Sequence, residues 1–136
     1  MVSQLSIAEE APTMTKPIVM SGRSVAEFLY QRRFRISSEK ILQDDVEKAF
    51  VRADIPYERE KSLSPGDRVD FLVDGRIALE LKIKGRAARH MAQIERYAKH
   101  ACVDSIVLLT NVPVGHVPTM HEKKPCFVVS LGRQAF

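Results

Sequence analysis

Hydrophobic and polar residues alternate most regularly over residues 67–82, in two short runs separated by an Asp-Gly pair. Because successive side chains of a β-strand point to opposite faces, this alternation predicts a β-hairpin with one apolar face. The apolar positions are Val69, Phe71 and Val73 in the first run and Ile77, Leu79, Leu81 and Ile83 in the second. We expect both sets to enter one core, which places Asp70 on the polar face together with Glu80 and Lys82.

The register of this hairpin decides which face Asp70 occupies. A two-residue turn would pair Asp70 with Leu79 and turn the acid toward the core, because a slip of one residue inverts every side chain of a strand. We therefore predict a three-residue loop, residues 73–75, which pairs Asp70 with Ala78. A bulge is expected at Gly75, because glycine tolerates the left-handed backbone that this loop type requires.

Helical periodicity predicts two longer helices, over residues 38–53 and 86–101, and a short one within residues 23–35. The apolar stripe consists of Leu42, Val46, Ala49 and Phe50 in the first helix and of Ala87, Met91, Ile94, Ala98 and Ala101 in the second. Ser37 or Ser38 can cap the first helix, since a serine hydroxyl accepts a hydrogen bond from an N–H of the first turn. Further strands are predicted over residues 55–61, 104–110 and 126–131.

Asp70, Glu80 and Lys82 on one polar face indicate a site for a divalent metal and a phosphate. Magnesium prefers oxygen ligands, and one or two carboxylates suffice when waters and a substrate phosphate supply the rest. The cation makes a water more acidic and neutralises charge that grows on the phosphate, and a lysine nearby can orient that water. The alternative is that these side chains are only the solvated face of a half-buried hairpin.

Glu39 is a further candidate, because the period of its helix places it on or beside the buried face. A carboxylate there requires a partner, since an unpaired buried charge is costly. It is either a third metal ligand or an acid stabilised by the dipole of the first helical turn. If the helix is rotated from this estimate, Glu47 takes its place.

Basic residues gather beside polar or aromatic ones in two other places. Arg32 and Arg33 are interleaved with Tyr30 and Phe34, a pattern that suits a phosphate backbone or unstacked bases. The same segment also suits packing on the core or on a second copy of the chain. In the helix over residues 86–101, one flank either positions phosphates or is an ordinary solvated surface; it carries Arg86, Arg89, Gln93 and Tyr97.

The composition is that of a soluble globular protein of one domain, with 136 residues, of which 45% are hydrophobic and 28% charged. The net charge of +4 is compatible with a polyanionic partner. The two cysteines show no metal-type spacing and indicate a reduced, intracellular protein. No run approaches the roughly 18 apolar residues of a membrane span, and the N-terminus lacks the pattern of a signal peptide. We therefore expect a cytoplasmic protein without a membrane partner.

The predicted order of elements, helix, strand, hairpin, helix and strand, resembles the core of the PD-(D/E)xK nucleases. Asp70 matches the acid on the second core strand of that family, and Glu80-Leu81-Lys82 matches its ExK triplet. Glu39 resembles the first-helix glutamate of Holliday-junction resolvases, and residues 93–97 resemble the QxxxY motif of the RecB-type exonuclease branch. The pattern departs at Val69, where the family has proline.

This resemblance covers about residues 38–111 and implies a restriction-endonuclease-like fold. That fold is an α/β core with a mixed central sheet flanked by helices, in the order α-β-β-β-α-β. Residues 37–136 are then the nuclease domain, and residues 1–36 are an N-terminal arm with a short basic helix. The implied activity is Mg²⁺-dependent hydrolysis of DNA phosphodiester bonds, in which Mn²⁺ can replace Mg²⁺.

The resemblance also implies a role for each candidate residue. The metal would be held by Asp70, Glu80, the backbone carbonyl of Leu81 and Glu39, and Lys82 would position the attacking water. The DNA would be contacted by Gln93, Tyr97, Arg86, Arg89, Arg32 and Arg33. A homodimer through an apolar patch of the N-terminal helix is also expected, because one small site cuts one strand at a time.

Two other functions compete with a nuclease. The first is a catalytically inactive nucleic-acid-binding or assembly module that keeps the same fold. The second, a small-molecule enzyme, lacks support, because the chain has no glycine-rich phosphate loop and no pairing of a nucleophile with a base. Within the nuclease hypothesis, the choice between end processing and cutting of junctions or duplexes stays open, as does the choice between DNA and RNA.

Overall fold

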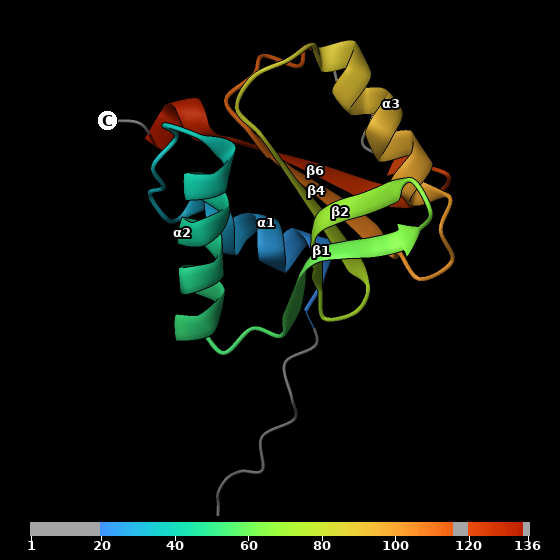
Figure 1. Cartoon of the computed structure of the whole chain (residues 1–136), viewed down its shortest axis with the longest axis horizontal. Helices are drawn as coiled ribbons and strands as arrows, with labels where there is room; N and C mark the ends of the chain where they lie inside the picture. The colour runs from blue at the N-terminus through green and yellow to red at the C-terminus, as the bar shows by residue number, and fades with distance from the viewer. Residues whose placement is uncertain (1–19, 116–119, 135–136) are drawn as a thin grey trace, which may run out of the picture.

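Residues 20–115 and 120–134 are described by the structure, a computed structural model, which contains a six-stranded sheet with helices on both faces (Figure 1). The helices are α1 (Gly22–Tyr30), α2 (Glu39–Arg52), α3 (Ala87–Ala98) and the short 3-10 helix η2 (Leu131–Gln134). The strands are β1 (Tyr57–Ser64), β2 (Asp67–Val73), β3 (Ile77–Lys82), β4 (Ser105–Thr110), β5 (Met120–His121) and β6 (Lys124–Ser130).

The strands lie in the order β1-β2-β3-β4-β6-β5. Strands β1, β2 and β3 are antiparallel, β3, β4 and β6 are parallel, and β5 pairs antiparallel with β6. The expected α/β class, with a mixed sheet flanked by helices, is therefore confirmed. None of the described helices is long and apolar enough to cross a lipid bilayer.

Two layers of apolar side chains, one on each face of the sheet, hold the helices in place. Helices α1 and α2 cover the face that carries Phe71 and Leu79, and α3 covers the face that carries Leu72 and Ala78. Burying one large apolar side chain contributes about 1.5–3 kcal/mol. Figure 1 shows α2 and α3 on opposite sides of the sheet. Both helices therefore present side chains to the same hairpin, β2–β3, from opposite faces.

The β2–β3 hairpin has a three-residue loop, as predicted, but the loop is residues 74–76 and not 73–75. The ladder pairs Val73 with Ile77, and one more residue in this register would place Asp70 opposite Glu80 rather than Ala78. The loop makes its turn with two successive left-handed residues, with φ of 54° at Asp74 and 70° at Gly75. The shift is an even number of residues, so the side chains that the ladder pairs, at positions 71–73 and 77–79, keep their predicted faces.

Arg76 is the extra residue of this loop and takes the irregular position that we expected at Gly75. Its N–H donates to the Val73 carbonyl (3.1 Å), and its guanidinium bonds to the carboxylates of Asp74 and Asp104, both at 3.1 Å. Asp104 is distant in the sequence, so a tertiary contact helps to fix the loop.

Val69 lies on the opposite face from Phe71 and Val73, contrary to the alternation. It is fully buried with Leu72 and Ala78 under α3. The irregularity is centred on Asp70. Across from it, β1 has a left-handed residue, Glu60 (φ 51°), between the pairs Arg59–Phe71 and Lys61–Val69. A left-handed residue within a strand re-aims the neighbouring side chains and increases the local twist.

Helix α2 forms as predicted, and α3 is shorter and rotated. In α2, Ser38 accepts a hydrogen bond from the N–H of Ile41 (3.1 Å), and the fully buried residues are Leu42, Val46 and Phe50. In α3, the buried residues are His90, Ile94, Tyr97 and Ala98. The larger side chains of His90 and Tyr97 take the inner positions that we assigned to Ala87 and Ala101, and Ala101 is exposed beyond the helix.

Helix α1 belongs to the core rather than to a separate arm. Its N-terminus is fixed by a reciprocal pair of hydrogen bonds between Ser21 and Ser24, and Val25 and Leu29 are fully buried in the same apolar layer as α2. The predicted boundary at residue 36 therefore does not separate α1 from the domain. Its apolar face is covered by the chain's own sheet, so it is not the exposed dimer patch that we expected. Residues 1–19 of the predicted arm lie outside the described residues.

Candidate functional site

Asp70 and Glu80 interlock where the β2–β3 ladder ends. Oδ2 of Asp70 accepts a hydrogen bond from the main-chain N–H of Leu81 (2.8 Å), and the N–H of Asp70 donates to Oε1 of Glu80 (3.2 Å). Each carboxylate thus takes a place in the hairpin that a main-chain carbonyl would otherwise fill. The two acids come from adjacent inner strands of the sheet, so a rigid scaffold positions both of them.

Lys82 completes the trio that the alternation predicted. Its Nζ lies 2.9 Å from Oε2 of Glu80. The side chain of Glu80 is 3% exposed and that of Lys82 18%, so the pair lies at the boundary between the core and the surface. The two acids and the amine therefore meet at this end of the hairpin. The face that we expected to be polar is not a solvated one, because Leu72 and Ala78 on it are buried under α3.

Helix α2 brings two more polar side chains to this end of the hairpin. Oε2 of Glu39 accepts from the N–H of Ile83 (3.3 Å), which follows directly after β3. Nε2 of Gln43 donates to Oδ1 of Asp70 (3.0 Å). Sequence reasoning missed Gln43, although its spacing from Glu39 was a signal, because residues i and i+4 of a helix lie on the same face.

Glu47, the substitute for Glu39, has a different task. Its carboxylate accepts from the hydroxyl of Tyr57 (2.6 Å) and from the guanidinium of Arg59 (2.8 Å), which also bonds to Asp44 and to Oε1 of Gln43. These contacts tie α2 to the edge strand β1. Gln43 therefore joins this network to Asp70 and orients one of the two acids.

Both acids are hard to ionise in this environment. Burial raises the pKa of Asp70, and burial together with the negative charge of Asp70 raises the pKa of Glu80 to about 7. The pKa of Lys82 is raised although burial opposes it, because Glu80, Asp70 and Glu39 all favour the ammonium. Three carboxylates face one ammonium, so the fully ionised cluster has an excess of two negative charges.

The donor set fits a hydrated Mg²⁺ better than a metal with an all-protein shell. In the part of the chain that the structure describes, no group of three or more His, Cys, Asp or Glu side chains is arranged to hold a metal ion by itself. Magnesium needs only one or two carboxylates and keeps several waters. A dication would also neutralise the excess negative charge of the cluster, which is the physical reason for the fit.

The main-chain carbonyl of Leu81 faces the side of the acids. Successive residues of a strand direct their main-chain groups to alternate neighbours. The carbonyl of Lys82 faces β4, where it accepts from the hydroxyl of Thr110 (2.6 Å), and the N–H of Leu81 faces Asp70. The Leu81 carbonyl shares the direction of its own N–H, which places it where the resemblance requires a ligand.

Tyr97 is placed in the core and not on a binding surface. It is fully buried, and its hydroxyl donates to the carbonyl of Arg68 (2.8 Å). It therefore cannot contact a nucleic-acid strand, and this part of the prediction is wrong. The residue instead fastens α3 to β2 two positions before Asp70. Burial raises the pKa of the Tyr97 hydroxyl, and the negative charges of Glu80 and Asp70 raise it further.

The remaining basic candidates lie at two separate places. Arg86 and Arg89 are exposed at the start of α3, a short loop after Lys82, and Gln93 is partly exposed one turn further on. Arg32 and Arg33 lie in the segment between α1 and α2 and line a groove with the outer side of α2. The basic residues at the start of α3 thus follow the acid cluster in the chain, whereas Arg32 and Arg33 belong to another surface.

Comparison with protein-family models, with curated proteins and with solved structures finds no match for this chain.

Proposed function

We propose that this chain is a metal-dependent nuclease of the PD-(D/E)xK type, which hydrolyses DNA phosphodiester bonds on a restriction-endonuclease-like core. The observation that carries the proposal is the convergence of Asp70, Glu80 and Lys82 at the open end of one hairpin. One buried and one partly buried acid, both with raised pKa values, and an excess of negative charge are typical of a functional site rather than a solvated surface.

The chain's own residues divide the work as follows. Asp70, Glu80 and the carbonyl of Leu81 would hold Mg²⁺, and Glu39 would hold it or orient a water. When bound, the cation would neutralise charge on the phosphate and lower the pKa of a water that it binds. Gln43 fixes the rotation of the Asp70 carboxylate through its hydrogen bond (3.0 Å).

Lys82 is suited to position the attacking water. Its ammonium is held beside Glu80 and stays charged throughout the neutral range, because its pKa is raised above the ordinary value. A charged donor at this place directs a water or a phosphate oxygen without accepting a proton itself. On α3, Arg86, Arg89 and Gln93 would contact the phosphates beside the scissile bond.

Cleavage of supercoiled plasmid and of end-labelled linear DNA, with Mg²⁺ or Mn²⁺ and with EDTA as the blank, tests this proposal. We expect Lys82→Ala to lower the cleavage rate by about 100-fold, because the attacking water loses the charged group that positions it. The matched control is Lys61→Ala, which removes an exposed lysine paired with Glu58 on the edge strand β1. Wild-type cleavage by the Lys82 variant would contradict the assigned role.

A second candidate, an inactive nucleic-acid-binding or assembly module, is favoured by one observation. Both acids already accept hydrogen bonds from main-chain N–H groups of the hairpin, so they have a structural task without any chemistry. Tight DNA binding without cleavage in any divalent ion would support this candidate. A panel of supercoiled, nicked, single-stranded and branched DNA on one gel separates end processing from junction or duplex cutting.

A further inference from the structure

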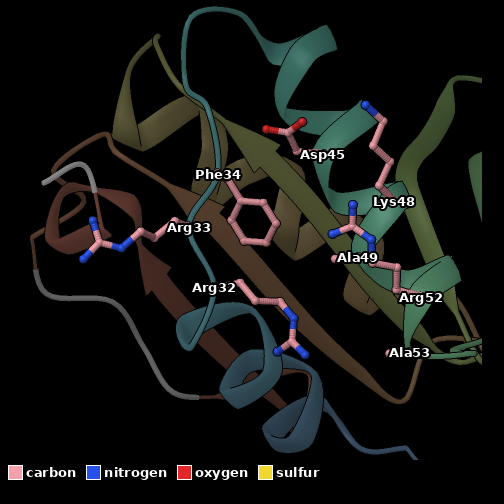
Figure 2. Close-up of a pocket in the computed structure, with 8 residues that line it drawn as sticks. All are labelled: Arg32, Arg33, Phe34, Asp45, Lys48, Ala49, Arg52 and Ala53. Atoms are coloured by element: carbon pink, nitrogen blue, oxygen red, sulfur yellow. The ribbon is translucent and has the colours of Figure 1, made fainter.

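A groove of about 560 Å³ lies between the segment that follows α1 and the C-terminal half of α2. Its lining includes four basic residues, one aromatic ring and one acid: Arg32, Arg33, Lys48, Arg52, Phe34 and Asp45. In the view of Figure 2, the ring of Phe34 lies between Arg33 on one side and Lys48 and Arg52 on the other. With about 3.6 residues per helical turn, Lys48 and Glu39 point to opposite sides of α2, so the groove is separate from the acid cluster.

The groove is held in shape by an ion pair at its rim. Asp45 accepts three hydrogen bonds from Arg35, one from the main-chain N–H (3.0 Å) and two from the guanidinium (3.1 and 2.7 Å). These bonds fasten the segment to α2. They also engage the one acid of the lining, whose pKa is lowered by the bond with Arg35.

Two cations of the groove lack an ion-pair partner among the described residues, although the charge of Lys48 helps to lower the pKa of Asp45. Lys48 and Arg52 form no ion pair with any other residue in the ranges 20–115 and 120–134. The helix dipole favours Arg52, which lies in the last turn of α2, but it does not account for the gathering of four basic residues. Like charges that converge on one groove repel one another, so an anionic ligand would relieve this repulsion.

Phe34 gives the groove an apolar surface among these charges. The ring is only partly buried and packs on the core with one side. Arg32 is fixed nearby, because its guanidinium lies 3.4 Å from the ring centre of Phe28 and donates to the Phe28 carbonyl (2.8 Å). Cations that follow a backbone, with an aromatic ring between them, are the pattern by which proteins bind unpaired strands.

We propose that this groove binds a segment of single-stranded nucleic acid, with its phosphates on Lys48, Arg52 and Arg32 and a base stacked on Phe34. A duplex is a poorer fit, because its bases are already stacked and do not offer a free face to the ring. The identity of the ligand as a nucleic acid rests on the proposed nuclease function, for which the groove would hold the strand away from the point of cleavage. The binding itself does not require a metal.

The test is fluorescence anisotropy of a short labelled oligo-dT with the full chain in EDTA, where cleavage is blocked. We expect the double variant Lys48→Ala/Arg52→Ala to bind about tenfold more weakly and to reduce the salt slope by about 1.4, at about 0.7 for each lost phosphate contact. The control, Lys40→Ala/Lys61→Ala, removes the same charge from other surfaces and should keep the wild-type affinity. Equal affinity of the groove variant and the wild type would overturn the proposal.

Phe34→Leu tests the stacking part and Phe34→Tyr is its matched control. Leucine should weaken oligo-dT binding by about 5- to 100-fold, and tyrosine, which keeps the stacking face, should retain it. Thermal unfolding of each variant shows whether the folded state is kept; if Phe34→Leu is unfolded, the tyrosine and cation variants still decide the question. Equal displacement of oligo-dT by poly-glutamate, or tighter binding of a duplex, would overturn the assignment to single strands.

The groove and the acid cluster can fail separately. Loss of oligo-dT binding in the groove variants, with no cleavage by the wild type in any divalent ion, supports the groove and contradicts the nuclease. Cleavage that depends on Lys82, with oligo-dT binding unchanged in the groove variants, supports the nuclease and contradicts the groove.

Discussion

The main chemical feature at the scale of single residues is that the environment of Asp70 and Glu80 disfavours their ionised forms. Burial raises both pKa values; the negative charge of Glu39 adds to the rise at Asp70, and that of Asp70 adds to the rise at Glu80. Lys82 offsets part of this cost through its bond to Glu80 (2.9 Å). A protein that retains such a pair carries a destabilising arrangement in its fold, which is the pattern expected where charge is needed for binding.

Stability should therefore fall as the pH rises between about 5 and 8. The pKa of Glu80 is about 7 in the folded chain and lower in the unfolded chain, so the unfolded chain holds fewer protons in this window and deprotonation favours unfolding. The loss from Glu80 is at most about 3 kcal/mol, at about 1.4 kcal/mol for each pKa unit. Urea unfolding of the wild type and of Glu80→Gln at both pH values measures it, and the variant should lose less.

Glu58→Gln is the control for this titration. Glu58 is exposed on β1 and pairs with Lys61, so its removal should leave the wild-type pH dependence in place. His90, whose pKa is lowered by burial, changes stability in the opposite direction, but it is present in all three proteins and cancels in the comparison. Equal losses of stability in the wild type and in Glu80→Gln would show that Glu80 does not titrate in this range.

At the scale of elements, α3 is fastened to the strand that carries the first acid. The hydroxyl of Tyr97 donates to the carbonyl of Arg68, and His90 closes the other end of the helix, where its ring contacts the Lys84 carbonyl (3.0 Å). A Cβ at Gly85 would lie 2.8 Å from that ring, so the chain passes there only as glycine. The helix thus gives β2 a fixed support just before Asp70.

Tyr97→Phe is expected to lower the free energy of unfolding by about 0.5–1.5 kcal/mol, because the hydrogen bond from the hydroxyl to the Arg68 carbonyl is lost. Affinity for DNA should stay at the wild-type value, since the side chain is fully buried. Gln93→Ala, one turn earlier in α3, is the control and should change stability by less than about 0.5 kcal/mol. Urea unfolding and oligonucleotide anisotropy measure the two effects; a large loss of affinity with unchanged stability would return Tyr97 to the binding surface.

The elements differ in how far the sequence could predict them, and the difference is physical. The alternation in β2 and β3 and the stripe of α2 depend on local periodicity, and they placed Asp70, Glu80, Lys82 and Glu39 together. The loop position depends on Arg76, whose guanidinium is held by the distant Asp104. The rotation of α3 depends on a bond from Tyr97 to Arg68 across two elements. Such tertiary partners leave no periodic trace in the chain.

At the scale of the whole molecule, the sheet topology brings three separate segments to one point. Strands β2 and β3 supply the acids from inner positions of the sheet, α2 reaches them with Glu39 and Gln43, and α3 follows β3 with its exposed basic side chains. The excess of negative charge arises only from this assembly, because no single element carries it. A cation that neutralises the cluster should therefore stabilise the fold as a whole.

Mg²⁺ is accordingly expected to raise the melting temperature at about pH 8, where the acids are most ionised. A ligand at ten times its dissociation constant stabilises the folded state by about 1.4 kcal/mol, since the gain follows RT ln(1 + [L]/Kd). For a domain of this size that gain corresponds to a rise of about 3–8 °C. Asp70→Asn should abolish the rise because it removes one ligand and one charge, and KCl at matched ionic strength should not reproduce it. Differential scanning fluorimetry measures these melting temperatures. A rise of equal size in Asp70→Asn would place the bound cation elsewhere and leave the acid pair with only its structural role.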